Sequence, residues 1–155
     1  MLRRSSIVPL IAAAVLAAAG CGTKENDLAP AACLATNTGY LRALERAPGD
    51  VRLGGSTPIS GCLVPDQDGG QLANIGQEMI IAATKLNAEA RQGSAAATLQ
   101  LGYLIGAVSK GASSIHTDLV RRLNSAARFS ESGGALSASF ERAFGRGYAA
   151  GHNSG

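Results

Sequence analysis

Residues 70–91, GQLANIGQEMIIAATKLNAEAR, carry the strongest helical pattern of the chain. Their apolar side chains recur at steps of three and four residues and would line one face of a helix: Leu72, Ile75, Met79, Ala82, Ala83, Leu86 and Ala90. Asp68 precedes this stretch as a capping residue, and Gln92-Gly93-Ser94 follows it as a break. We therefore predict a central core helix over 70–91.

Residues 95–110 are apolar on almost every side, which predicts a buried helix. The segment is too short, and too interrupted by Gln100, to span a bilayer. Gly102 and Gly106 lie about one turn apart on it, a spacing that lets another helix approach closely. Tight packing within the same domain is the favoured interpretation. The alternative is an intermolecular helix pair of the kind known from membranes.

Two further helices are predicted toward the C-terminus. The first, over 115–129, would turn Ile115, Leu119, Leu123 and Ala126 to the core and His116, Asp118, Arg121, Arg122 and Arg128 to solvent. The second carries a stripe at every fourth residue: Leu136, Phe140, Phe144 and Tyr148. Burial of this stripe would favour a structural role, whereas its exposure would favour binding of a partner or an apolar ligand.

The segment before residue 70 is less regular. Asn37 or Thr38 can cap a short helix that runs to Arg46, and residues 50–65 are rich in turn formers, with room for one short strand pair. We find no internal repeat. The fold class that follows is all-α, a small bundle of four to five helices with an irregular, disulfide-clamped N-terminal segment.

The first twenty residues have the three-part plan of a secretory signal. Arg3 and Arg4 are basic, and residues 7–19 are apolar apart from Pro9. A helix of this length reaches only about 20 Å, which is short of the roughly 30 Å hydrocarbon core of a bilayer. We therefore expect this segment to be cleaved rather than to remain as a membrane anchor. Export would follow the general secretory route or, given the two arginines, the twin-arginine route.

Ala19-Gly20-Cys21 resembles the lipobox of bacterial lipoproteins, although Ala18 stands where that family more often has Leu. The resemblance covers residues 1–21 and implies that Cys21 receives a diacylglyceryl group and becomes the new N-terminus. It implies an exported protein anchored at the outer face of the cytoplasmic membrane, or at the outer membrane, which Gly22 would permit. An ordinary signal peptide cut near Ala19, with Cys21 as a free thiol, is the alternative.

These assignments divide the chain into a signal peptide (1–20), a lipidated cysteine and tether (21–30), one helical domain (31–150) and a flexible tail (151–155). Of the 14 Lys and Arg residues, Arg3 and Arg4 leave with the signal, so 12 basic and 11 acidic side chains remain. Because the charge is balanced and tryptophan is absent, we expect no nucleic-acid partner.

The cysteines fit the same scheme. If Cys21 carries lipid, only Cys33 and Cys62 remain, in a compartment where disulfides persist, and we expect them to pair. A catalytic or metal-binding thiol has no support, since neither a C-x-x-C pair nor a neighbouring histidine is present.

No known catalytic, phosphate-binding or metal-binding motif occurs in the chain, so we assign no catalytic residue, no metal and no cofactor. His116 and Asp118 point apart on a helix, and Glu78 and Glu89 would lie about 16 Å apart. The leading hypothesis is a non-enzymatic envelope module that binds an envelope protein or a small apolar ligand. An enzyme with a cleft joining 50–65 to His116 or Glu78 is one alternative, and a purely structural lipoprotein is the other.

Overall fold

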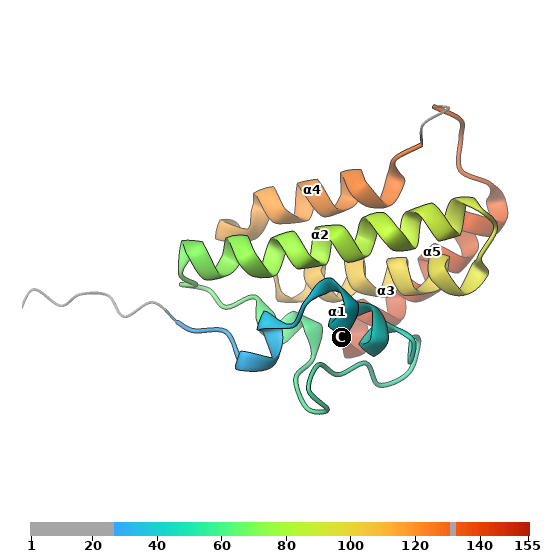
Figure 1. Cartoon of the computed structure of the whole chain (residues 1–155). Helices are drawn as coiled ribbons and strands as arrows, with labels where there is room; N and C mark the ends of the chain where they lie inside the picture. The colour runs from blue at the N-terminus through green and yellow to red at the C-terminus, as the bar shows by residue number, and fades with distance from the viewer. Residues whose placement is uncertain (1–26, 131–132) are drawn as a thin grey trace, which may run out of the picture.

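The computed structural model describes residues 27–130 and 133–155, and these form the predicted all-α fold (Figure 1). The five helices are α1 (Asn37–Leu44), α2 (Gly69–Arg91), α3 (Ala95–Gly111), α4 (Thr117–Arg128) and α5 (Ala138–Ser154). Three short 3-10 helices accompany them: η1 (Ala31–Leu34), η2 (Ile59–Cys62) and η3 (Ser114–His116). Within the described ranges there is no strand, and 50–65 holds one isolated bridge, between Leu53 and Thr57.

Side-chain caps set where the three long helices begin. The Asp68 carboxylate accepts from the backbone N–H of Gln71 at 2.9 Å, and the Ser94 hydroxyl accepts from Ala97 at 3.2 Å. The Ser137 hydroxyl does the same at the start of α5. Each cap satisfies a backbone donor that the first helical turn leaves unpaired. Gly93, at φ +97°, makes the tight turn that joins α2 to α3.

Helices α2 and α3 form a hairpin, α4 packs on α2, and α5 packs on α3 (Figure 1). Near its start, α2 brings Gly76 against Leu119 at the start of α4, and near its end Asn87 bonds Phe129 just beyond α4. Helices α2 and α4 therefore run parallel. The same holds for α3 and α5, because Gly102 lies against 144–148 and Gly106 against 148–152.

Helices α3 and α5 touch backbone to backbone. A Cβ atom on Gly102 or Gly106 would lie 2.1 Å from a carbonyl oxygen of α5. Reciprocally, a Cβ on Gly147 or Gly151 would lie 1.9 or 2.1 Å from a carbonyl oxygen of α3. Non-bonded heavy atoms do not approach so closely, so each of the four positions needs glycine. The predicted close packing around Gly102 and Gly106 is thus confirmed as a contact within the domain.

The centre of the core is α3, which corrects the prediction that 70–91 would be central. Every residue from 101 to 108 is buried, and α3 contacts α1, α2, α4, α5 and η2. Helix α2 has one buried face and one exposed face, as its periodic pattern predicted. Helix α3 takes the centre because it is apolar on all sides, and a helix at the edge of the bundle would leave part of that apolar surface in water.

The expected disulfide between Cys33 and Cys62 is present and joins η1 to η2. Both cysteines are fully buried, and the hydroxyl of buried Tyr40 donates to the Cys33 carbonyl at 2.8 Å. Burial raises the pKa of that hydroxyl above its ordinary value, and the nearby Glu78 carboxylate adds to the effect. The bridge therefore closes a loop within the irregular N-terminal segment, and this segment contacts the long helices through α1 on α2 and η2 on α3.

Two predicted boundaries are wrong. The tether was placed at 21–30, but Asp27 N–H already donates to the Asp66 carbonyl, and Ala29 N–H donates to Gln71 Oε1 at 2.8 Å. The tail at 151–155 was expected to be flexible, but α5 continues to Ser154 and Gly155 is buried against Ala107. The Ser60 hydroxyl donates to the Gly155 carbonyl at 2.6 Å, which holds this end against η2.

The predicted signal peptide (1–20) and the lipidation site at Cys21 lie outside the described residues. Among the helices at 27–130 and 133–155, none combines the length and apolar character needed to cross a bilayer.

Candidate binding groove and buried polar network

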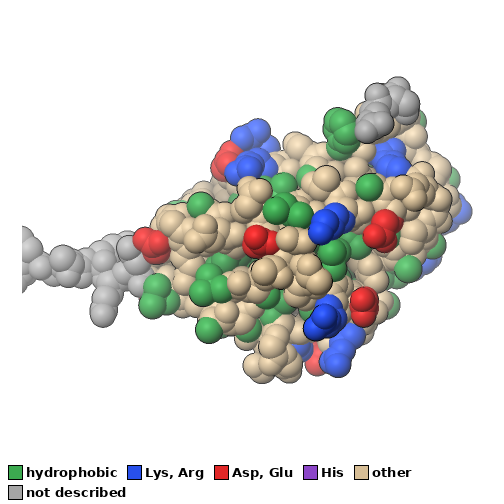
Figure 2. All heavy atoms as spheres, in the orientation of Figure 1, with side chains coloured by type: hydrophobic (Ala, Val, Ile, Leu, Met, Phe, Trp, Pro, Cys, Tyr) green, Lys and Arg blue, Asp and Glu red, His purple; other side chains and the backbone are tan. Residues whose placement is uncertain are grey.

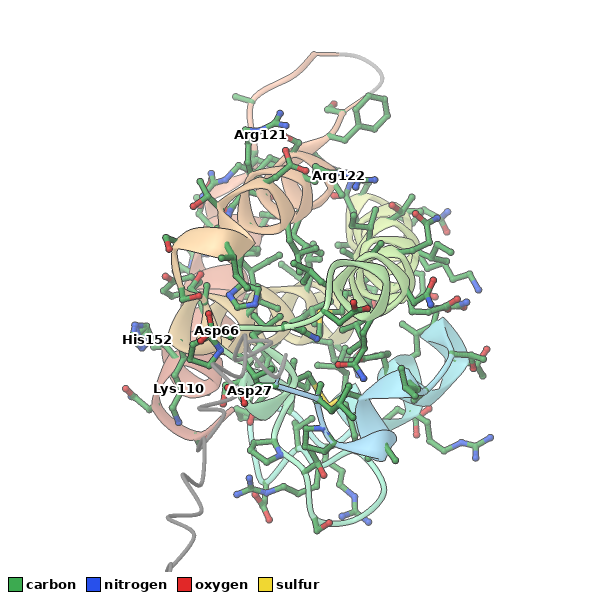
Figure 3. All side chains as sticks on the ribbon, turned by 90° about the vertical axis from the view of Figure 1, so that its left-hand side faces the viewer. Asp27, Asp66, Lys110, Arg121, Arg122 and His152 are labelled. Carbon is green, nitrogen blue, oxygen red and sulfur yellow. A yellow bond between two sulfur atoms is a disulfide. The ribbon has the colours of Figure 1, made fainter. Side chains whose placement is uncertain are left out.

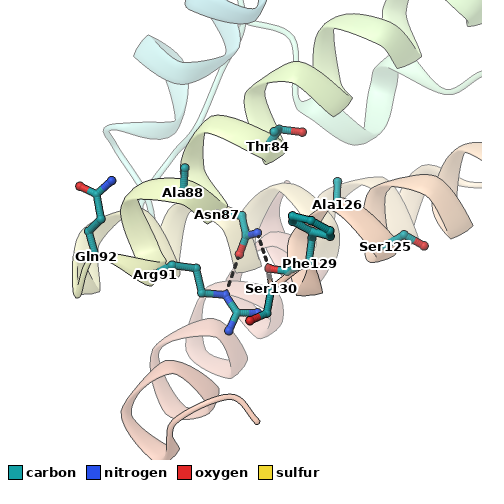
Figure 4. Close-up of a pocket in the computed structure, with 9 residues that line it drawn as sticks. All are labelled: Thr84, Asn87, Ala88, Arg91, Gln92, Ser125, Ala126, Phe129 and Ser130. Carbon is teal, nitrogen blue, oxygen red and sulfur yellow. Dashed lines mark hydrogen bonds between the residues drawn. The ribbon is translucent and has the colours of Figure 1, made fainter. Parts of the chain in front are cut away.

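A groove of about 840 Å³ lies between the C-terminal half of α2 and the end of α4 (Figure 4). Its size falls in the range of small-molecule sites. Nine residues line it: Thr84, Asn87, Ala88, Arg91, Gln92, Ser125, Ala126, Phe129 and Ser130. The lining contains one cation, no acidic residue, and an aromatic ring that is 62% exposed, that of Phe129.

Hydrogen bonds fix the polar wall of this groove. The Asn87 amide donates to the Phe129 carbonyl at 2.9 Å and accepts from Arg91 Nε at 3.3 Å (Figure 4). Arg91 Nη2 also donates to the Arg128 carbonyl, and its guanidinium lies 5.3 Å from the centroid of the Phe140 ring. No acidic side chain within the described ranges forms a salt bridge with Arg91. Its positive charge is therefore held in place and, among the described residues, has no acidic partner.

The sequence did not reveal this groove, because Phe129 was assigned to the apolar-polar pattern of a helix. Helix α4 ends at Arg128, and Phe129 has extended backbone angles, φ −59° and ψ 135°. Its carbonyl is tied to Asn87, so the ring stands out from the bundle rather than in the core. The sequence feature that could have indicated an exposed ring is the position of Phe129, a large aromatic residue directly after the polar end of a helix.

The prediction that His116 is solvated is wrong, since this side chain is fully buried. Its Nδ1 accepts from the Ser113 backbone N–H at 2.9 Å, so the other ring nitrogen carries the proton. That Nε2 lies 3.3 Å from Gln67 Oε1, and the Gln67 amide donates to the Cys62 carbonyl at 3.2 Å. This network joins η3 to the segment before α2 and to the disulfide.

Burial lowers the pKa of His116 below its ordinary value, because desolvation penalises the charged imidazolium. The neutral ring is also the form that accepts from Ser113. The geometry and the pKa shift therefore agree that His116 is a neutral structural hydrogen-bonding group. Asp118 lies on the exposed side of α4 and pairs with Arg121, so the two residues do not form a joint site.

Glu78 holds the start of α1 by accepting hydrogen bonds from Asn37. Its carboxylate accepts from the side-chain amide of Asn37 at 2.8 Å and from its backbone N–H at 2.5 Å. Lys85 donates to the Asn37 side chain at 2.7 Å. These hydrogen bonds, first the one from the Asn37 side chain and then the one from its backbone, lower the Glu78 pKa and keep the carboxylate ionised.

The cleft required by the enzyme hypothesis is not assembled at these groups. Glu78 lines a cleft of about 370 Å³ between η1 and α2, to which neither His116 nor any residue of 50–65 contributes. Among the residues at 27–130 and 133–155, no group of three or more His, Cys, Asp or Glu side chains could hold a metal ion.

The aromatic stripe of α5 faces the core. Phe140 and Phe144 are buried, with ring centroids 5.9 Å apart, and Tyr148 is partly buried. Leu136 precedes the helix, which begins at Ala138. By the criterion stated above, this burial favours a structural role over binding at the stripe, and a ligand would need a separate surface, such as the α2–α4 groove.

Comparison with known proteins gives no matching family model, no matching curated protein and no matching solved structure.

Proposed function

We propose that this protein is a lipid-anchored protein of the cell envelope, held by a lipid on Cys21, that binds an apolar ligand without changing it chemically. The observation that supports the binding role is the α2–α4 groove, in which the exposed Phe129 ring stands beside Arg91. An apolar body could cover the ring, and an anionic or hydrogen-bond-accepting end could meet the guanidinium.

The groove can be tested with 1-anilinonaphthalene-8-sulfonate, an aromatic anion whose fluorescence rises in apolar surroundings. Phe129→Ala should weaken its binding about tenfold, which corresponds to about 1.4 kcal/mol of lost apolar contact. Leu34→Ala is the matched control, because Leu34 is also large and exposed, at 55%, but lies on η1. Equal affinities for the two variants would contradict a binding role for the groove.

The anchor is tested by the intact mass of protein isolated from membranes, with Cys21→Ala alongside. A chain that begins at Cys21 and carries a diacylglyceryl mass is expected, and the variant should lack that mass. An unlipidated soluble chain would overturn the proposed anchor, and the hypothesis of a secreted enzyme would then be favoured.

A further inference from the structure

We infer that one end of the bundle, the end where Asp27 enters the fold, rests directly on the bilayer with Leu28 and Ile115 in contact with lipid. This inference rests on the proposed lipid anchor at Cys21. It adds a second membrane contact, made by the folded domain itself, and a fixed orientation.

Leu28 and Ile115 are exposed apolar side chains that the fold brings to one place. They are 74% and 45% exposed, although large aliphatic side chains usually avoid water. The backbone of Asp27 forms a bridge with Gln67, and the side chain of Gln67 lies 3.3 Å from His116. Each exposed residue is therefore the chain neighbour of a residue held against Gln67.

Further apolar surface is exposed on η1. Leu34, 55% exposed, closes η1, and it lies beside residues 74–78 in the first half of α2. In Figure 2, hydrophobic side chains are scattered over the visible face, and some of them lie near the point where the described residues begin. Three of the four large exposed hydrophobic residues in the described ranges thus lie on η1, η3 or the entering chain.

The tether is too short to hold this end far from the membrane. Asp27 is already fixed to the fold, so five residues, or six Cα–Cα steps, separate it from Cys21. Fully extended, they span about 20 Å, at roughly 3.3–3.6 Å per residue. A lipid on Cys21 would therefore keep Leu28 within reach of the bilayer surface at all times.

The side chains at this end carry charges of both signs, so they give no preference for anionic lipids. Figure 3 looks onto it and labels Asp27, Asp66, Lys110, Arg121, Arg122 and His152. Acidic and basic side chains are both present, and Arg121 pairs with Asp118. The contact should therefore depend on apolar burial rather than on electrostatic attraction, and high salt should leave it unchanged.

The test uses the lipidated full-length protein in phosphatidylethanolamine–phosphatidylglycerol vesicles with brominated acyl chains, which quench nearby tryptophan. The chain has no tryptophan, so Leu28→Trp, Ile115→Trp and Phe129→Trp each introduce one emitter. Phe129 is the matched control, because it is also exposed and lies beyond the opposite end of α4, about 20 Å from Ile115. Positions 28 and 115 should lose most of their emission, and position 129 should keep it.

A Leu28→Ser change in the Ile115→Trp protein separates docking from mere tethering. Docking predicts a severalfold loss of quenching at position 115, whereas unchanged quenching would overturn the inference. Quenching at all three positions, or at none of 28 and 115, would also overturn it while the protein still floats with the vesicles. A protein that does not float would refute the lipid anchor itself, and the docking with it.

Discussion

At the scale of single residues, His116 illustrates how a short 3-10 turn decides the environment of a side chain. Helix α4 begins only at Thr117, and the turn before it leaves Ile115 half-exposed while His116 points inward. The sets 115/119/123/126 and 116/119/123/127 fit helical spacing equally well. Because histidine is polar, the sequence favoured the first set, but the buried set is the second. The hydrogen bonds that allow His116 to be buried, to Ser113 and Gln67, could not be predicted from the sequence.

The buried histidine predicts a pH-dependent stability. The unfolded chain binds a proton at His116 below about pH 6.5, but the folded protein resists it, because burial lowers the pKa. The contribution is therefore complete above that pH and is lost as the pH falls below it, by at most about 1.4 kcal/mol per pH unit. Urea unfolding of the wild type between pH 7 and pH 5 should show this slope, at conditions of roughly constant ionic strength.

Two variants locate the origin of that slope. His116→Gln should be less stable at pH 7 and should lose the part of the slope that His116 contributes. His152→Gln changes the other, exposed histidine and should keep it. A wild-type slope in the His116→Gln protein would show that other groups cause the acid sensitivity.

At the scale of helices, the contact between α3 and α5 predicts opposite effects for two similar substitutions. Gly106→Ala places a methyl group 2.1 Å from the Tyr148 carbonyl oxygen, so the helices must separate, and we expect a loss of about 3 kcal/mol. Gly145→Ala adds its methyl group to open space at an exposed position of α5 and should stabilise the protein by about 0.5–1 kcal/mol. Thermal unfolding of both variants measures the difference, and equal effects would refute the close contact.

The helices themselves could be predicted, but their partners could not. Asp68, Ser94 and the Gly93 turn mark the limits of α2 and α3 in the sequence, and the structure begins and ends these helices there. Nothing local identifies α5 as the neighbour of α3, because that contact joins residues more than forty positions apart.

A usable signal for that pairing was nevertheless present and was missed. Gly-Tyr-x-x-Gly occurs at 102–106 and again at 147–151, on the two helices that touch. Leu-Asn-x-x-Ala-Arg occurs at 86–91 and 123–128, near the ends of α2 and α4. The arginines that end these motifs both lie over α5 rings, Arg91 on Phe140 and Arg128 on Phe144. The successive helix pairs α2 and α3, and α4 and α5, therefore share motifs in the same order, although the spacing between the motifs differs.

At the scale of the whole molecule, the disulfide predicts how far the irregular segment contributes to stability. Cys33 and Cys62 are 29 positions apart, and closing a loop of that size removes about 3–4 kcal/mol of unfolded-chain entropy. Replacing both with alanine should lower the free energy of unfolding by about that amount. Denaturation of the wild type with a reductant should show the same loss, and an unchanged midpoint would mean that the bundle is stable without the clamp.

The two ends of the bundle have different surfaces. Leu28 and Ile115 are exposed where the chain enters, and the groove with Phe129 lies between the C-terminal half of α2 and the end of α4. If the first end lies on the bilayer, the groove lies toward the far end of the domain, in the aqueous compartment. The ligand would then be met in that compartment rather than taken directly from the membrane.

The contact between α3 and α5 also limits how this chain can change over evolutionary time. Most tight packing can drift, since a larger side chain on one helix is accommodated by a smaller one on its neighbour. Here the atoms facing Gly102, Gly106, Gly147 and Gly151 are backbone carbonyl oxygens, and there is no side chain to shorten. A mutation at any of the four has no compensating mutation opposite, so every descendant that keeps this fold should inherit all four glycines.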